Sequence, residues 1–267
     1  AIAAVQELNE RGASATLDYL GESVHNAAAA AEAARQYIAL LHAITRLQAD
    51  ANVSLKLTQM GLDVDPDMCR RHVERIVAQA GEFKNFVRID MEGSRYTQTT
   101  LDLFRDVYSR LPNVGVVIQA YLYRSEADIR MLNEIGARVR LCKGAYDEPA
   151  EVAFPKKEDT DQNFIQLMRL LLSEGHYPAI ATHDERMIAA TREYAERHGI
   201  APNRFEFQML YGVRRDLQRQ IVRDGYRLRV YVPYGDEWYP YLMRRMAERP
   251  ANLMFIARGV LRDRGEN

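Results

Sequence analysis

The stretch VGVVIQAYLYRSEADIRMLNEIGARVRLCKGAY, residues 114–146, decides the fold, because it places a helical pattern between two apolar runs. The runs at residues 114–121 and 139–143 have the β-branched and aliphatic content of strands. Between them, Ser125 followed by Asp128 resembles a capping box, and Gly136 stands where a helix C-terminal glycine belongs. A strand, a helix and a second strand in this order predict a βαβ unit with parallel strands.

The same unit repeats along the rest of the chain. Further short runs of Val, Ile, Leu, Phe and Tyr are separated by segments with helical periodicity. Asp65 followed by Pro66 marks one helix start, since proline suits the first helical position. We expect strands at residues 15–20, 53–57, 86–91, 114–121, 139–143, 179–183, 205–210 and 227–232.

Eight strands alternating with helices in 267 residues predict an α/β protein, a single-domain (β/α)8 TIM-type barrel. The domain is expected to span residues 1–267, with a short N-terminal segment before the first strand near residue 15. An open, doubly wound sheet usually carries a glycine-rich nucleotide turn, and neither G-x-G-x-x-G nor G-x-x-x-x-G-K-[ST] occurs in the sequence. Their absence favours the closed barrel.

Composition narrows the function classes. The sequence is 47% hydrophobic and 27% charged, with a formal net charge of -1, so no overall field attracts nucleic acid or an anionic membrane. The two cysteines, Cys69 and Cys142, form no C-x-x-C pair, which predicts free thiols and a reducing cytoplasm. We find no signal-peptide pattern and no apolar run long enough to span a membrane.

Polar residues cluster at the carboxyl ends of the expected strands, where barrel enzymes place their active sites. Charges in strands that are buried on both faces are costly unless they are paired or functional. Alternatives stay open for single positions, because Lys56 with Asp90 could be a structural ion pair and His183 a structural histidine. The convergence of five consecutive strands on one rim favours a site that includes Lys56, Asp90, Gln119, Arg140, Lys143, Thr182, His183 and Asp184.

A second cluster follows the last expected strand. Tyr241, Arg244, Arg245 and Glu248 have helical spacing and share one face. The face could be a solvated stripe with an Arg244–Glu248 pair, but two adjacent arginines beside a tyrosine would also bind a carboxylate.

The six histidines form no metal-binding pattern, and no G-x-S-x-G elbow is present. The remaining chemistries are a cofactor or a lysine in a barrel strand. From the residues alone, a flavin oxidoreductase and a Schiff-base aldolase or lyase that uses Lys56 or Lys143 both stay open. A non-enzymatic module that binds anions through Arg244 and Arg245 is a third reading.

The sequence resembles the proline dehydrogenase family, in particular its short monofunctional bacterial members. The matching stretches are ATLDYLGE, VSLKLTQMG, RIDMEG, VVIQAYLYRS, RLCKGAYDEP, ATHDERM, FEFQMLYG and VYVPYGDEWYPYLMRRMAERPAN, which extend from Ala15 to Asn252. Each stretch is weakly specific, but their order and coverage decide between the open readings.

The resemblance implies an FAD at the barrel mouth and gives roles to individual residues. Asp90, beside Lys56, and Arg140, near the flavin ring, would be catalytic. The proline carboxylate and ring would be bound by Lys56, Leu210, Tyr231, Tyr241, Arg244 and Arg245. The flavin and its phosphates would be held by Met91, Gln119, Arg140, Lys143, Gly144, Ala145, Tyr146, Thr182, His183 and Glu248.

The resemblance also implies the reaction. The C5 hydrogen of L-proline would leave as a hydride to flavin N5, giving pyrroline-5-carboxylate, and the electrons would pass to a membrane quinone. A cationic clamp would fix the ring and favour the neutral amine, and Arg140 would stabilise the charge of the reduced flavin. These roles imply a cytoplasmic protein with peripheral contact at the inner face of the membrane.

Overall fold

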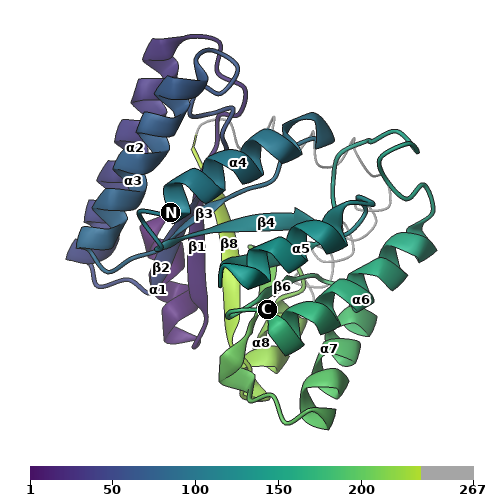
Figure 1. The fold of residues 1–267 in the computed structure, drawn as a ribbon. Helices are drawn as coiled ribbons and strands as arrows, with labels where there is room; N and C mark the ends of the chain where they lie inside the picture. The colour runs from purple at the N-terminus through teal and green to yellow at the C-terminus, as the bar shows by residue number, and fades with distance from the viewer. Residues whose placement is uncertain (236–267) are drawn as a thin grey trace.

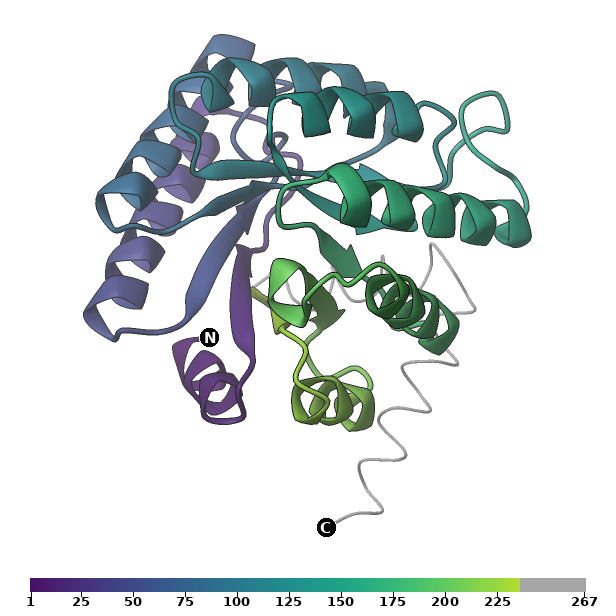
Figure 2. The same ribbon diagram turned by 60° about the horizontal axis from the view of Figure 1, so that its bottom comes forward.

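The computed structural model describes residues 1–235, and within them eight parallel strands form a closed barrel in the order β1 to β8. The last strand closes on the first, with Leu17 opposite Val232. Figures 1 and 2 show the helices packed around the outside of the strands. The strands are β1 (Ser14–Tyr19), β2 (Ala51–Leu55), β3 (Val87–Ile89), β4 (Val114–Gln119), β5 (Arg138–Cys142), β6 (Ala179–Ala181), β7 (Glu206–Leu210) and β8 (Leu228–Tyr234).

Helices alternate with these strands, as the periodicity predicts. The α-helices are α1 (Ile2–Glu10), α2 (Ala27–Arg46), α3 (Pro66–Glu82), α4 (Thr97–Tyr108), α5 (Ser125–Glu134), α6 (Lys157–Glu174), α7 (Glu185–Arg197) and α8 (Arg215–Arg223). Two short 3-10 turns are η1 (Ser94–Tyr96) and η2 (Pro202–Arg204). Each helix buries its apolar stripe against the barrel, and the core between the two layers is continuous.

All eight predicted strands are confirmed, with ends that differ by a few residues at most. Asp65 caps α3 as predicted, because its side chain accepts hydrogen bonds from the backbone N–H groups of Asp67 and Met68. The capping box at Ser125 is wrong. Ser125 is the first residue of α5, and its hydroxyl donates to the Gln119 carbonyl, while Asp128 pairs with Arg124.

The short N-terminal segment that the sequence places before β1 forms the helix α1. Val5 and Leu8 lie on one face of this helix and are buried, which explains why it packs. Residues 236–267 lie outside the described part of the chain, so the extension of the single domain to residue 267 stays a prediction.

The inside of the barrel is polar, whereas most such barrels are filled with branched apolar side chains. Thr16 and Asn52 share a hydrogen bond there, and Arg229 pairs with Glu206 at 2.9 Å. Arg88, 3% exposed, donates to the carbonyls of Val116 and Arg138. Buried charges are stable only when they are paired in this way, so the barrel is held by a network of partners.

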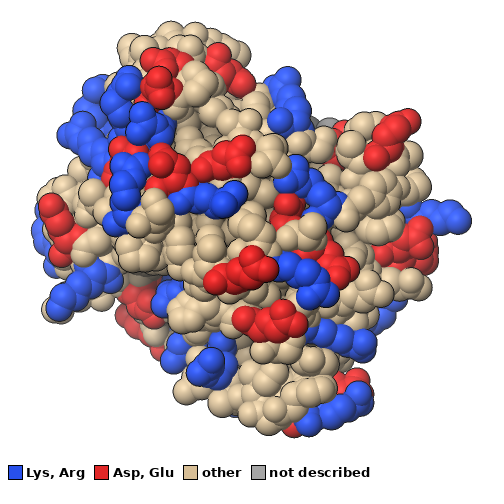
Figure 3. Space-filling model, viewed as in Figure 1, with Lys and Arg blue, Asp and Glu red and all other residues tan. Residues whose placement is uncertain are grey.

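Both cysteines are free thiols, Cys69 buried and Cys142 half-buried. None of the helices in residues 1–235 is long and apolar enough to cross a membrane. On the face seen in Figure 3, acidic and basic side chains are interspersed, most densely over α3 and α4. Several basic side chains adjoin one another at the upper left of this view, with acidic side chains beside them.

Candidate active site

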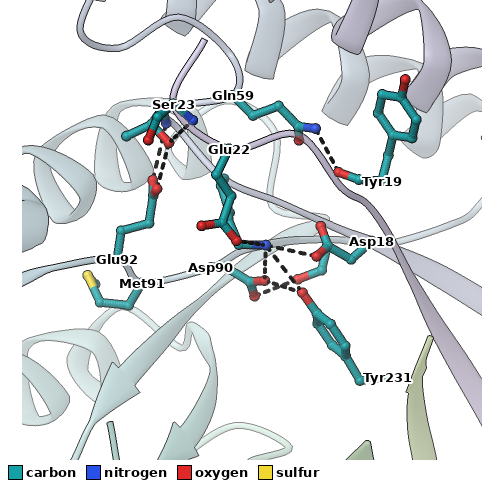
Figure 4. A network of polar contacts seen from close by, with 12 residues as sticks. Asp18, Tyr19, Glu22, Ser23, Gln59, Asp90, Met91, Glu92 and Tyr231 are labelled. Carbon is teal, nitrogen blue, oxygen red and sulfur yellow. Dashed lines mark hydrogen bonds and ion pairs between the residues drawn. The ribbon is translucent and has the colours of Figure 1, made fainter. Parts of the chain in front are cut away.

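Polar side chains converge at the carboxyl ends of the strands, as the sequence predicts. Lys56 and Asp90 lie directly beyond β2 and β3, and Arg140 lies within β5. Tyr231 in β8 reaches the same cluster across the barrel (Figure 4). Chain segments far apart in sequence therefore meet at one buried point.

Asp90 is the centre of this cluster. Its Oδ1 accepts hydrogen bonds from Arg140 Nη1 at 2.7 Å and from Ser54 Oγ at 2.6 Å. Its Oδ2 accepts one from the Tyr231 hydroxyl at 2.8 Å. The Arg140 guanidinium also lies over the Tyr231 ring, 5.3 Å from the ring centroid. Asp90 thus fixes both a cation and an aromatic wall in one orientation.

Lys56 is buried, with 3% of its surface exposed, and carboxylates surround its ammonium group. Asp18 Oδ2 is 2.8 Å from Lys56 Nζ, Glu22 Oε1 is 3.5 Å away, and Asp90 Oδ2 is 3.7 Å away (Figure 4). The Lys56–Asp90 pair considered from the sequence is present, but Asp18 is the nearer partner. The charge of Lys56 is therefore largely compensated by the protein itself.

The pKa values of the two buried carboxyl groups Asp90 and Asp18 shift in opposite directions. Burial alone would raise the pKa of Asp90, but Arg140 and Lys56, with hydrogen bonds from Ser54 and Tyr231, outweigh burial and lower it. For Asp18, burial dominates and raises the pKa despite Lys56, and the neighbouring charge of Asp90 adds to the rise. Asp90 is thus the carboxylate that stays ionised most readily.

The loop after β1 is tied to the cluster by a second network (Figure 4). The Ser23 N–H donates to Thr58 Oγ1 at 3.1 Å, and the Thr58 hydroxyl donates to Glu92 Oε1 at 2.6 Å. Gln59 Nε2 donates to the Tyr19 carbonyl at 2.6 Å. These bonds hold the segments after β1, β2 and β3 in fixed relative positions.

On the β5–β6 side, Lys143 pairs with Asp161 at 2.5 Å and Asp184 at 2.9 Å. Lys143 is therefore embedded in acidic partners, and Asp184 also caps α7. Hydrogen bonds from Lys143 and Arg186 overcome the effect of burial and lower the pKa of Asp184 to about 2.

His183 Nε2 accepts a hydrogen bond from the Leu210 backbone N–H at 2.8 Å, which joins β6 to β7. Burial, with the Arg214 charge, lowers the pKa of His183 to about 4, so the ring is neutral at pH 7. The neighbouring Thr182 is buried, and its hydroxyl accepts the Asp184 N–H. Thr182, His183 and Leu210 thus lie together at the mouth.

Two buried polar atoms of the described residues fit a flavin. Arg140 Nε and Gln119 Oε1 are buried and have no hydrogen-bond partner within residues 1–235. Within this part of the chain, Arg140 Nε is a free donor and Gln119 Oε1 a free acceptor, so together they suit a ring that carries both acceptors and donors. Gly144 has φ +111°, and a Cβ there would approach the Tyr121 ring to 2.4 Å, so only glycine fits. Met91 lies beside this region, because its carbonyl accepts a 3.5 Å bond from Gln119 Nε2.

Four residues predicted for the site, Tyr241, Arg244, Arg245 and Glu248, lie outside the described residues. Ala145 and Tyr146 are half-buried in the loop after β5. Sequence reasoning missed Asp18, Glu22 and Glu92. The pattern that indicated Lys56 and Asp90, a charged residue at or near the end of an apolar strand, could have indicated these three residues as well.

Fold and site together define a class, the (β/α)8-barrel enzymes whose reaction centre lies at the carboxyl ends of the strands. Residues 1–258 match the family model for proline dehydrogenase. The chain is 46% identical over 259 residues to proline dehydrogenase 2 of Bacillus subtilis, covering 97% of this chain and 86% of that one. It is 43% identical over 267 residues to the proline dehydrogenase of Deinococcus radiodurans, covering 98% and 86%.

A solved structure is also similar, the proline utilization A protein of Bdellovibrio bacteriovorus inactivated by N-propargylglycine. The TM-score is 0.85 at 28% identity, over 92% of this chain and 31% of that much longer one. The chain belongs to the proline dehydrogenase family. It is an oxidoreductase that oxidises proline in the first step of proline catabolism, and its family is one of flavoenzymes.

The Schiff-base reading loses its physical support as well. It requires a neutral lysine next to cations, but both candidate lysines have carboxylate neighbours.

Proposed function

We propose that the cofactor is FAD and that the cluster around Asp90 is the place where L-proline is oxidised to pyrroline-5-carboxylate. The observation that carries the proposal is the position of Arg140. Asp90 and Tyr231 orient its guanidinium, while its Nε is buried without a partner among the described residues. The flavin, when bound, would supply the acceptor for the hydride that leaves proline C5.

The residues of the chain would bind and orient the substrate, and they would exclude water from it. Tyr231 and Leu210 would wall the proline ring, and Lys56 would meet its carboxylate together with Arg244 and Arg245. Because Lys56 already has three carboxylate neighbours, most of the charge that attracts the substrate carboxylate would come from the two arginines. Arg140 would lie where negative charge grows during the reaction, held there by Asp90.

The cofactor contacts would come from two sides of the mouth. Gln119 and Met91 lie on the β3–β4 side, and Gly144 to Tyr146 on the β5 side. Lys143 would bind the phosphate groups only if its ion pair with Asp161 or with Asp184 were broken. Thr182 and His183 would complete this side, and Glu248 would join from outside the described residues.

The purified protein should be yellow. Under anaerobic conditions, L-proline should bleach the flavin absorbance much faster than D-proline does. The measurement is a stopped-flow flavin spectrum with each enantiomer. A colourless protein that gains no proline oxidation from added FAD would overturn the proposal.

For reoxidation we propose a membrane quinone, reached by peripheral contact from the cytoplasmic side. This part rests on the family resemblance alone. Turnover with a soluble quinone analogue, together with co-sedimentation on anionic vesicles, tests it. An enzyme that reacts with oxygen but never with quinones would refute it.

A further inference from the structure

The loop between β5 and α6, residues 143–156, is long and reaches across the edge of the barrel at the right of Figure 1. Both of its ends are fixed on the segment after β4. Near its start, Tyr121 N–H donates to the Lys143 carbonyl at 2.9 Å, and Gly144 packs on the Tyr121 ring. Near its end, Phe154 N–H donates to the Tyr121 carbonyl at 2.8 Å.

Besides the Tyr123 hydroxyl, which donates to the Ala150 carbonyl at 2.8 Å, the middle of the loop is fixed by the side chain of Glu148. Its Oε1 accepts the Ser94 backbone N–H at 2.6 Å, and its Oε2 accepts the Ser94 hydroxyl. The Tyr121 hydroxyl is 3.5 Å from Oε1. Ser94 belongs to a different part of the chain, the segment that follows β3. A half-buried carboxylate with two donors from one residue is a strong, directional contact.

The contact joins two segments that matter for the proposed site. Ser94 lies four positions beyond Asp90, in the same short segment as Met91. Glu148 lies just beyond Lys143 to Tyr146, which are the residues proposed to hold the cofactor. The bond therefore sets the distance between the acidic centre of the site and the cofactor loop.

We propose that Glu148 is a positioning residue that latches the β5–α6 loop onto Ser94 and thereby retains the flavin. This inference rests on the proposed function. Without the latch, the loop would lose its contact with Ser94 in the segment after β3, and it would open more often. Opening would release the cofactor without altering the groups that contact proline.

The test uses the purified full chain with its flavin and compares Glu148→Ala with Glu148→Gln. The matched control is Glu151→Ala, because Glu151 is an exposed acid in the same loop. Two quantities are measured, the rate of FAD release by the rise in flavin fluorescence and the amide exchange of residues 91–97 and 143–156 by mass spectrometry.

We expect Glu148→Ala to release FAD about tenfold faster and to exchange faster in both segments. Glu148→Gln, which keeps one acceptor oxygen for the Ser94 N–H, should lie in between, and Glu151→Ala should match the wild type. The KM for proline at saturating FAD should stay unchanged in all variants, whereas a general loss of structure would raise it.

Faster exchange with unchanged FAD release would overturn the inference, since the latch would then not serve the cofactor. Unchanged exchange, or equal effects in Glu151→Ala and Glu148→Ala, would overturn it too. A wild-type protein that retains no FAD would remove the proposed function and this inference with it. The wild-type measurement thus separates the two failures.

Discussion

Asp18 Oδ2 lies 2.8 Å from Lys56 Nζ, and both side chains are almost completely buried. Asp18 in turn lies 3.2 Å from the hydroxyl of Tyr37, a fully buried residue of α2. Lys56 is therefore anchored to the outer helix layer through Asp18, and it lies within ion-pair distance of three carboxylates. It is both a structural cation and a residue of the proposed substrate site.

We predict that Lys56→Met lowers the free energy of unfolding by about 3–5 kcal/mol, because buried carboxylates lose their counter-charge. The double variant Lys56→Met with Asp18→Asn should recover part of that loss. The KM for proline should be raised in both, since neither has the ammonium group. Thermal denaturation and steady-state kinetics measure the two effects.

The control is Arg11→Met, which breaks an exposed pair with Glu7 and should cost less than about 1 kcal/mol. If the double variant were no more stable than Lys56→Met alone, the Asp18–Lys56 pair would not be the source of the loss. A normal KM in the double variant would remove Lys56 from the substrate site.

Asp90→Asn tests the orientation of Arg140. Asparagine can keep an acceptor oxygen at the Oδ1 position for Ser54 and Arg140, but it places an amide NH2 opposite the Tyr231 hydroxyl and removes the charge opposite the guanidinium. We expect kcat/KM for proline to fall by about tenfold or more, which is about 1.4 kcal/mol. The matched control is Asp106→Asn, an exposed acid on α4 paired with Arg110, and it should have no effect. Wild-type kinetics in Asp90→Asn would show that the carboxylate has no catalytic role.

His183 predicts a pH dependence of stability. Its pKa is lowered from 6.5 to about 4 in the folded chain, so the unfolded chain takes up a proton first as the pH falls. Stability from this group is fully present above pH 6.5 and is lost as the pH drops toward 4, at no more than about 1.4 kcal/mol per pH unit.

The melting temperature should therefore fall more between pH 7 and pH 5 in the wild type than in His183→Gln. Glutamine can accept the Leu210 N–H through its side-chain oxygen but does not titrate. His198→Gln is the control, because His198 is exposed at the end of α7. Equal losses in the wild type and His183→Gln would show that His183 does not carry the dependence.

The sequence predicts the barrel well because the apolar runs and helix signals are local and repeat eight times. It predicts Lys56, Asp90 and Arg140 because charges in strands with two buried faces are rare. It could not show that Asp18 is the nearer partner of Lys56, because that depends on the register between β1 and β2, where Asp18 pairs with Ser54. The contact between Glu148 and Ser94 joins two loops, and no periodic pattern encodes such a contact.

The remaining prediction concerns Tyr241, Arg244, Arg245 and Glu248, which the sequence predicts to share one helix face. With Lys56 compensated by Asp18, Glu22 and Asp90, a substrate carboxylate needs further cations. Two guanidinium groups can each bind a carboxylate through paired hydrogen bonds, and lysine keeps the charge but loses this geometry. Arg244→Lys and Arg245→Lys should each lower kcat/KM by about tenfold or more, or about 1.4 kcal/mol.

Steady-state kinetics of the two variants separate a carboxylate clamp from a solvated stripe, because exposed ion pairs contribute little. Arg223→Lys, on α8, is the control for the loss of an arginine, and it should leave kcat/KM unchanged. Tetrahydrofuran-2-carboxylate should compete with proline in the wild type and less well in both clamp variants, whereas pyrrolidine, which has no carboxylate, should bind poorly to all. Near-normal kcat/KM in both variants would show that the paired hydrogen bonds of the two guanidinium groups are not needed, and it would contradict the predicted carboxylate clamp.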